Sequence, residues 1–377
     1  MKRLFAAILL IITILGLAGC GLTDPIYTTT GSTAPTQEAT TLTVHFIDVG
    51  QADCALLECE GEYMLIDGGN VEDSSLVVSY LEQQGVTKLE SVVCTHAHED
   101  HVGGLAEVLA TFETGAVYAP TRTYASNCFD DFVYYADQQG LEIIIPNPGD
   151  VIELGSATAT VMGPVQSYAD PNNTSIVLMV AFKGTRFLFT GDMETQAEND
   201  MLDYWGESCD WHADVLKVGH HGSDTSTGYR FLNEVMPQYG VISVGAGNSY
   251  GHPCEAPLSK LRDADVTVYR TDSLGTIVFT TDGTTLSCRN FEGTTPPVGT
   301  DKPNSTEPTQ SPEPTEPQPS DTEPETTQGQ TYIGNINSKK LHLPTCSSLP
   351  KEENRVYFSS YEDAIAEGYV PCSRCLG

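Results

Sequence analysis

Hydrophobic and polar positions alternate between residues 42 and 290 in a way that predicts strands separated by helices. The segment TLTVHFID (41–48) has a period of two, which is typical of a strand, and LESVVCT (89–95) predicts a buried strand. SSLVVSYLEQQG (74–85) predicts a helix with a serine cap that stops at Gly85. We expect further strands at 62–67, 158–163, 175–182, 185–190, 213–219, 240–245, 266–270 and 275–281, and helices at 130–140, 194–204 and 256–263. This order favours a mixed α/β domain.

Composition divides the 377 residues into five parts. Residues 21–41 are rich in Thr, Ser and Pro and predict a flexible tether. Residues 294–330 hold nine Pro, nine Thr and seven acidic residues, so they bury too little apolar surface to fold and predict a disordered linker. Between the two we expect one hydrolase-sized domain, 42–293, and after the linker a small module, 331–377.

The first 20 residues predict an export signal. Lys2 and Arg3 precede an apolar run that is too short for a good membrane span. The small residues before Cys20 resemble the lipobox of bacterial lipoproteins. That resemblance implies a lipid on Cys20 and a location at the extracellular face of the cell membrane. The alternatives are an uncleaved anchor and a plain secretory signal.

The segment CTHAHEDHVGG (94–104) carries the clearest chemical pattern, with three histidines and two acids in six positions. It follows a predicted strand, and we expect a helix to begin near Val102. Alternate residues of an extended stretch point the same way, and the following turn brings the next two side chains to a neighbouring point. Two adjacent ligand clusters suit two metal ions. Imidazoles favour zinc, and the carboxylates also admit manganese. The alternative is a set of solvated loop residues.

This segment resembles the HxHxDH signature of the metallo-β-lactamase superfamily. Further along, FIDVGQADC, MLIDGG, NNTSIVLMV, FLFTGDM, LKVGHHGSDTS and SYGHP occur in the order of the soluble hydrolase domain of ComEC competence proteins. The resemblance covers roughly residues 42–290. It implies an αββα sandwich that hydrolyses its substrate with two divalent metal ions.

The resemblance also implies ligands, position by position. His96 and His98 match the pair that holds the first metal, and Asp100 and His101 match the pair for the second. Asp192 matches the carboxylate that bridges the two ions.

Other matched positions leave alternatives open. His220 matches the late histidine ligand, with His221 as the second choice. Asp67 matches an early aspartate that orients a ligand or caps the loop, and the alternative is a turn residue before Gly68 and Gly69. Many members of the superfamily have a further histidine before the bridging aspartate, and here that region reads DPNNTSIVL. Asn173, Ser175 or water would have to supply the missing ligand.

Catalytic roles follow from the expected charges. Asp100 would orient the attacking water or accept its proton. His252 or Lys217 would assist the leaving oxygen, with a structural role for His252 and a packing role for Lys217 as the alternatives.

The resemblance implies DNA as the substrate, cleaved outside the membrane by a phosphodiesterase connected with the competence machinery, and we expect a monomer. Charge opposes this, because residues 42–293 hold ten Lys and Arg against 37 Asp and Glu, a net charge of −27. The alternatives are hydrolysis of a smaller phosphoester, a catalytically inactive DNA-binding protein at the cell surface, and a β-lactam hydrolase.

The tail predicts a second metal site. His342, Cys346, Cys372 and Cys375 form two close pairs of the kind that hold one structural zinc ion. A module of about 45 residues has little core, so a metal would stabilise it. The alternative is a disulfide within this set. The segment resembles the metal-binding domain of Ada repair proteins, a small α+β module. His342 replaces the cysteine that accepts the methyl group in that family, so we expect no methyl transfer here.

Overall fold

The structure is a computed structural model that describes residues 40–290, 332–336, 339–344, 346, 349–350, 354–372 and 375–376. The predicted signal 1–20 with Cys20, the tether up to residue 39 and the linker 294–330 lie outside the described residues. Within the described part of the chain, no helix is long and apolar enough to cross a bilayer.

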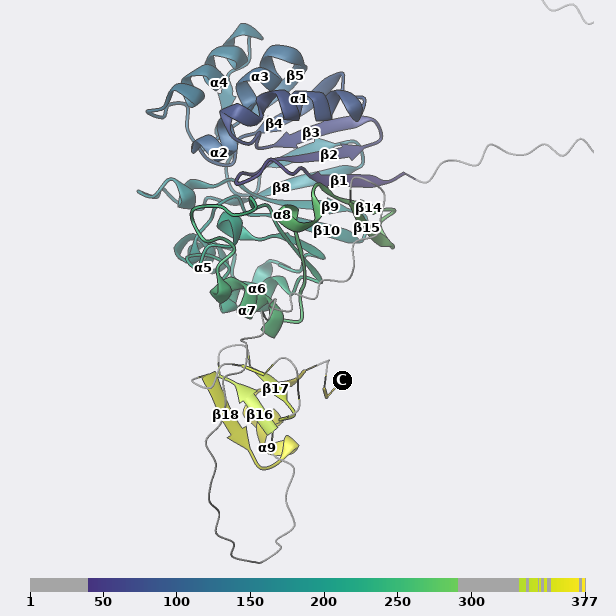
Figure 1. The fold of residues 1–377 in the computed structure, drawn as a ribbon, viewed down its shortest axis with the longest axis vertical. Coiled ribbons are helices and arrows are strands. Elements are labelled where there is room, and N and C mark those ends of the chain that lie inside the picture. The colour runs from purple at the N-terminus through teal and green to yellow at the C-terminus, as the bar shows by residue number, and fades with distance from the viewer. Residues whose placement is uncertain are drawn as a thin grey trace, which may run out of the picture. The chain divides into compact units, whose positions relative to one another are not determined.

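Two sheets lie face to face between two layers of helices (Figure 1). The first sheet has the order β15-β14-β1-β2-β3-β4-β5-β6. Its strands are β1 (Leu42–Phe46), β2 (Ala55–Cys59), β3 (Glu62–Ile66), β4 (Lys88–Val93), β5 (Glu113–Tyr118), β6 (Ile143–Ile144), β14 (Ile277–Thr281) and β15 (Leu286–Asn290). The helices on its side are α1 (Ser74–Gln83), α2 (Glu99–Val102), α3 (Leu105–Thr111) and α4 (Asn127–Gln138), with a 3-10 turn at Val71–Asp73.

The second sheet has the order β13-β12-β11-β10-β9-β8-β7. Its strands are β7 (Val151–Leu154), β8 (Ala157–Gly163), β9 (Val177–Phe182), β10 (Thr185–Phe189), β11 (Val215–Lys217), β12 (Tyr239–Ile242) and β13 (Thr267–Arg270). The helices of this half are α5 (Thr195–Trp205), α6 (Tyr229–Val235), α7 (Glu255–Asp263) and α8 (Thr271–Leu274), with 3-10 turns at Asn172–Thr174, Gly206–Ser208 and Gly219–Gly222. The arrangement is the expected αββα sandwich.

The central core lies between the two sheets. Phe46 of the first sheet stacks on Phe189 of the second, with ring centroids 5.6 Å apart, and both rings are buried. Fully burying one such side chain contributes roughly 1.5–3 kcal/mol. Separate buried clusters lie where each helical layer packs on its sheet. The strands are therefore held on both faces, which fixes their ends and the loops that leave them.

Most of the expected elements are present, but two helix starts differ from expectation and several elements, β2, β5, β7 and β15 among them, were not predicted. The helix expected near Val102 begins already at Glu99, so Asp100 and His101 lie in its first turn. Helix α1 begins at Ser74, but its cap position is Asp73 and no side chain caps it. The strand Ala55–Cys59 was not predicted, because a short apolar run does not distinguish a strand from a buried helical segment.

The C-terminal module is a small α+β unit. Its sheet has the order β18-β16-β17-β19. Its elements are β16 (Tyr332–Asn335), β17 (Lys340–His342), β18 (Arg355–Phe358), α9 (Tyr361–Ala366) and β19 (Val370–Pro371). Leu341, Phe358, Ala364 and Tyr369 form its apolar core, which is small for an independent fold.

Candidate metal centre

The metal-ligand residues expected from the sequence lie in loops that leave adjacent strands. Strands β3 and β4 are parallel, and so are β10 and β11, so the loops that follow each pair meet at one edge of its sheet. The loop after β4 carries His96 to His101, the loop after β10 carries Asp192, and the turn after β11 carries His220 and His221. The two sheets thus bring distant segments to one place.

Glycines allow the loop after β3 to lie against the ligand helix α2. A Cβ atom at Gly104 would overlap the carbonyl oxygen of Gly68, and one at Gly103 would overlap the backbone of Val71. The Gly68 N–H donates to the carbonyl oxygen of His101 over 2.7 Å. This close approach places Asp67 directly behind the ring of His101.

One ring nitrogen of His101 contacts Asp67, and the other ring nitrogen faces Asp192. Its Nδ1 lies 2.8 Å from Asp67 Oδ2, and its Nε2 lies 3.3 Å from Asp192 Oδ1. Burial alone would lower the pKa of His101, but the carboxylates of Asp192, Asp67 and Asp100 outweigh it and hold that pKa well above its usual value. The surroundings of His101 therefore favour a positive charge.

Asp100, His101, Asp192 and His221 form one compact group. Each offers a ligand atom, and these atoms all lie within 4.8 Å of one another. His221 Nε2 is 3.2 Å from Asp100 Oδ2 and 3.5 Å from Asp192 Oδ2. Burial would raise the pKa of Asp192, but His101 and His221 hold it well below its usual value. Ionised carboxylates facing imidazoles at this spacing suit a divalent cation.

The structure places His221, the second choice from the sequence, in the compact group, and it places His220 beside that group. His221 is buried and lies in the compact group, whereas the His220 side chain is 22% exposed, with Nε2 3.7 Å from Asp192 Oδ2. Both residues have left-handed backbones, with φ of 49° and 51°. This unusual pair turns His221 inward and leaves His220 at the rim.

His96 and His98 form a second pair beside this group. His96 Nε2 lies 3.0 Å from His98 Nδ1 and 4.0 Å from Asp192 Oδ2. His220 Nε2 approaches the same Asp192 oxygen, which also faces His221 of the compact group. Asp192 thus faces both groups of ligands, an arrangement that is compatible with a bridging carboxylate.

Asp67, Asn173 and Ser175 support the ligands. Asp67 accepts hydrogen bonds from Thr95 N and Thr95 Oγ1 at 2.7 and 2.8 Å while it contacts His101. Asn173 Oδ1 accepts from the backbone N–H of Glu194, and Ser175 Oγ accepts from that of Asp192 at 3.1 Å each. Asn173 and Ser175 thus fix the loop that carries Asp192.

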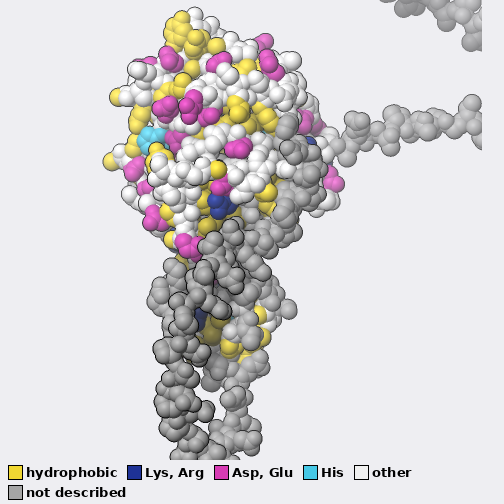
Figure 2. Space-filling view, viewed as in Figure 1, with side chains coloured by type: hydrophobic (Ala, Val, Ile, Leu, Met, Phe, Trp, Pro, Cys, Tyr) yellow, Lys and Arg dark blue, Asp and Glu magenta, His cyan; other side chains and the backbone are white. Residues whose placement is uncertain are grey.

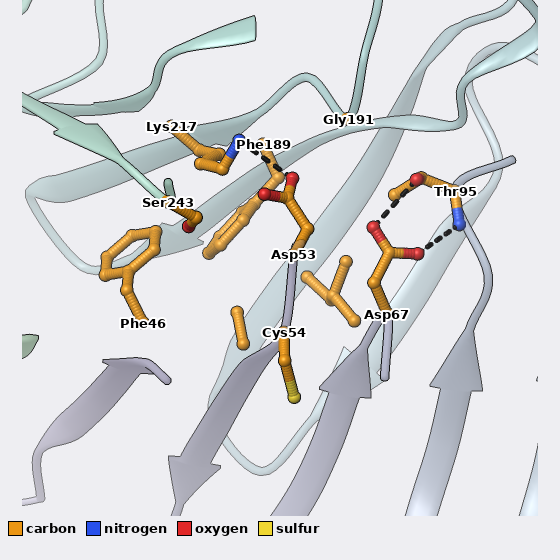
Figure 3. A pocket seen from close by; sticks show the side chains of 11 residues that line it. Phe46, Asp53, Cys54, Asp67, Thr95, Phe189, Gly191, Lys217 and Ser243 are labelled. Atoms are coloured by element: carbon orange, nitrogen blue, oxygen red, sulfur yellow. Dashed lines mark hydrogen bonds and ion pairs between the residues drawn. The ribbon is translucent and has the colours of Figure 1, made fainter. Parts of the chain in front are cut away.

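Lys217 lies where it cannot assist a leaving group, contrary to the sequence interpretation. It is 3% exposed, and its Nζ lies 2.7 Å from Asp53 Oδ2 and donates to the carbonyl oxygen of Val218 (Figure 3). Asp53 Oδ1 in turn lies 3.3 Å from His221 Nδ1. Asp53 was missed, although an aspartate immediately before the apolar run at residues 54–57 was an available signal.

His252 stands next to the centre, as the catalytic interpretation requires. Its ring stacks on that of His221, with centroids 6.5 Å apart and planes at 23°, and lies 5.7 Å from the ring of His220. Burial and the two neighbouring histidines lower the pKa of His252. The ring is therefore mainly neutral near pH 7.

The residues fit divalent metal ions by a criterion that is independent of the motif. Among the described residues, the buried atoms His101 Nε2 and Asp192 Oδ1 have no hydrogen-bond partner, although they face each other. Buried polar atoms are nearly always satisfied, so such a pair indicates a missing common partner. A metal ion between them would satisfy both atoms.

The C-terminal module brings together its four predicted zinc ligands. The ligand atoms of His342, Cys346, Cys372 and Cys375 all lie within 4.8 Å of one another, and His342 Nδ1 is 3.4 Å from Cys346 Sγ. The described cysteines of this set are not joined by a disulfide. The Leu343 N–H donates to Cys375 Sγ, a contact that suits a thiolate ligand.

Curated relatives of the chain include competence proteins. ComE operon protein 3 of Bacillus subtilis strain 168 is 29% identical over 255 residues, which are 63% of this chain and 32% of that protein. Competence protein ComA of Neisseria gonorrhoeae is 30% identical over 237 residues, 62% of this chain and 31% of that protein. The chain spans about a third of the length of these two relatives.

A solved structure and two family models match parts of the chain. Among solved structures, the metallo-beta-lactamase fold protein YhfI of Bacillus subtilis is 12% identical, with a TM-score of 0.44, and the match covers 64% of this chain and all of that one. The sequence model for the metal binding domain of Ada matches residues 321–376, which confirms the expected C-terminal module. The model for the metallo-beta-lactamase superfamily matches residues 47–246, more than half of the chain and the part that holds the metal centre. The chain therefore belongs to the metallo-beta-lactamase superfamily.

Proposed function

We propose that the chain is a metal-dependent phosphodiesterase that cleaves DNA outside the cell. The compact group of Asp100, His101, Asp192 and His221 carries this proposal, because its ligand atoms lie within 4.8 Å of one another. The relatives named as competence proteins support DNA as the substrate.

Two divalent cations, zinc or manganese, fit the donor set. Asp100, His101 and His221 would hold one ion, and His96 and His98 would hold the other, with Asp192 shared between them. When bound, such cations supply the positive charge that makes water nucleophilic near neutral pH and stabilises the phosphoryl oxygens.

Asp100 and His252 are the side chains placed to act on substrate and water. The Asp100 side chain is 30% exposed. Burial would raise its pKa, but His101 and His221 hold the pKa below its usual value, so it stays ionised. A carboxylate in this state orients an attacking water by accepting its hydrogen bond. The neutral ring of His252 is suited to donate a hydrogen bond to an oxygen of the phosphodiester.

The surface charge predicts how DNA would bind. Acidic side chains dominate the charged groups on the face of the hydrolase domain in Figure 2. With a net charge of −27 over residues 42–293, a polyanion approaches against repulsion. Binding would therefore depend on the metal ions and should improve when added divalent cations screen the surface.

The proposed location follows from the N-terminal sequence. Lipidation of Cys20 would hold the hydrolase domain at the extracellular face of the membrane, through the tether 21–41. There the domain would meet DNA in the medium, close to the machinery that imports it.

Asp192→Asn tests the proposal. Purified wild-type protein and the variant are loaded with zinc or manganese and incubated with labelled single- and double-stranded DNA. We expect the wild type to cleave DNA and the variant to lose most of its bound metal and its cleavage, because an amide oxygen is a much weaker bridging ligand. Equal cleavage by both proteins would overturn the proposal. Turnover of a small bis-phosphoester without cleavage of either DNA would establish the smaller substrate instead.

A further inference from the structure

A cavity of about 680 Å³ opens beside the metal centre, and Asp100 belongs to both. Its walls come from loops that are distant in the sequence, including residues 48–51, the turn at 70–73 and the loop at 246–250. This volume is within the range of small-molecule sites, roughly 300–1,000 Å³. A group bound there would lie next to the reacting bond.

Carboxylates are the most frequent polar groups in the lining of the cavity, and they disfavour a phosphate there. Its carboxylates are Asp48, Glu72, Asp73, Glu99, Asp100 and Asp272, and the lining residues include no lysine or arginine. Asp272 is paired with Arg270, and Asp73 accepts hydrogen bonds from Asn70. Glu72 and Glu99 are exposed at the cavity wall. An uncharged group with N–H donors fits this lining better than an anion.

An exposed aromatic ring also lines the cavity. Tyr250 is 72% exposed, and its ring stacks on His252 with centroids 5.7 Å apart and planes at 25°. Since His252 stacks on His221, three rings lead from the metal centre to the cavity. A large apolar ring exposed beside a reactive centre offers a surface for another planar group.

The loop that carries Tyr250 is held in place by Asn248. Asn248 Oδ1 accepts hydrogen bonds from the backbone N–H groups of Tyr250 and His252, at 3.1 and 3.0 Å. Its Nδ2 donates to the carbonyl oxygens of Gly245 and His252. The backbone that carries the ring is therefore held before any substrate arrives, which reduces the entropy that ordering this loop would cost.

We propose that this cavity binds one nucleobase of a single-stranded substrate, stacked on Tyr250. The exocyclic amino group of adenine, cytosine or guanine would donate to the carboxylates, and thymine, which lacks that group, would bind more weakly. A base inside a duplex is already stacked, so an unpaired base is the natural occupant. The statement that this base belongs to the strand being cleaved rests on the proposed function.

Binding of uncharged nucleosides tests the cavity without any cleavage. Adenosine, cytidine and thymidine are titrated into the metal-loaded full chain and followed by saturation-transfer NMR. We expect adenosine and cytidine to bind more tightly than thymidine. Tyr250→Ala should weaken adenosine binding at least about five-fold, and Tyr250→Phe should retain it, because stacking needs only the ring. Equal affinity for all three nucleosides, or no effect of Tyr250→Ala, would overturn the inference.

Two further variants separate recognition from misfolding. Tyr134 is another exposed tyrosine, on α4 and outside the cavity lining, so Tyr134→Ala should bind adenosine like the wild type. Glu72→Gln changes only one exposed acceptor and should reduce the preference for adenosine over thymidine. An unchanged preference in Glu72→Gln, or binding of spermidine with no binding of any nucleoside, would show that the cavity takes a different ligand.

Cleavage of labelled single-stranded oligonucleotides then distinguishes the two proposals. Selective nucleoside binding without cleavage of any phosphodiester would leave the base site standing and remove the nuclease function. Cleavage that is unaffected by Tyr250→Ala and by an abasic position next to the cut would keep the nuclease and remove the base site.

Discussion

The Nζ atom of Lys217 lies 2.7 Å from Asp53 Oδ2, and this ion pair is buried behind His221. The two side chains are only 4% and 7% exposed. The segment just before β2 is thus linked to the end of β11, a strand of the other sheet, by opposite charges directly beneath the metal centre. The pair touches neither solvent nor the region where substrate would bind, so its role is to hold Asp53 against Nδ1 of His221.

Breaking this pair should be costly. Lys217→Met leaves the Asp53 carboxylate buried without its cation, and we expect a loss of about 3–5 kcal/mol in the free energy of unfolding. The double variant Asp53→Asn, Lys217→Met removes both charges and should be more stable than the single variant. Urea unfolding of the three proteins measures this. A single variant with the wild-type midpoint would show that the pair contributes nothing.

Replacing the two adjacent histidines separately should show which one is the stronger metal ligand. Because His221 lies in the compact group, His221→Gln should lower the affinity for the second metal by more than the roughly 10–100-fold that the loss of a supporting group costs. His220→Gln serves as the matched control and should have the smaller effect. Competition with a chromophoric chelator gives both affinities. A larger loss in His220→Gln would restore the preference drawn from the sequence.

Glu198 should make the stability of the protein depend on pH. It is buried, and its carboxylate accepts hydrogen bonds from the backbone N–H groups of Thr227 and Gly228, in the loop that follows the two histidines. Burial raises its pKa from 4.5 to about 7, although these hydrogen bonds oppose the shift. Since the folded pKa is the higher one, the stabilising contribution is complete below pH 4.5 and is lost as the pH rises through 7.

The contribution of Glu198 can be isolated with Glu198→Gln, which does not titrate. The difference in unfolding free energy between wild type and variant should shift against the wild type by up to about 3 kcal/mol between pH 4.5 and pH 8. Urea midpoints at several pH values test this. A difference that stays constant with pH would mean that the carboxylate titrates normally.

Removing metal from the C-terminal module should expose its thiols. With zinc bound, Cys346, Cys372 and Cys375 should resist alkylation, and a chelator should make all three reactive, because a core of four apolar side chains cannot hold the module closed. Alkylation followed by mass spectrometry of the peptides checks this, with the partly exposed Cys128 as an internal reference. Thiols that react only after reduction would instead establish the disulfide alternative.

The histidine-rich segment could be interpreted from sequence because its ligands are local. His96, His98, Asp100 and His101 lie within six positions, so spacing alone brings them together after one strand. Asp192 was assigned through the resemblance to the metallo-β-lactamase superfamily, because it stands in the matching motif FLFTGDM at the end of a predicted strand.

Relationships that depend on tertiary structure were not accessible. His220 and His221 are identical neighbours, and only the left-handed backbone at both positions decides which ring points inward. Lys217 was interpreted as a possible proton donor because its partner could not be recognised. That partner, Asp53, is 164 positions away in the sequence and lies just before a strand of the other sheet. Composition and spacing do not reveal such pairings between layers.

The distribution of the ligands has a mechanical consequence. Residues 96–101 follow a strand of the first sheet, whereas Asp192 and His221 follow strands of the second. Any ion held jointly by these groups links the two sheets, and the sheets could separate only after that ion had been released. The affinity for the cation and the free energy needed to separate the two sheets therefore depend on the same bonds.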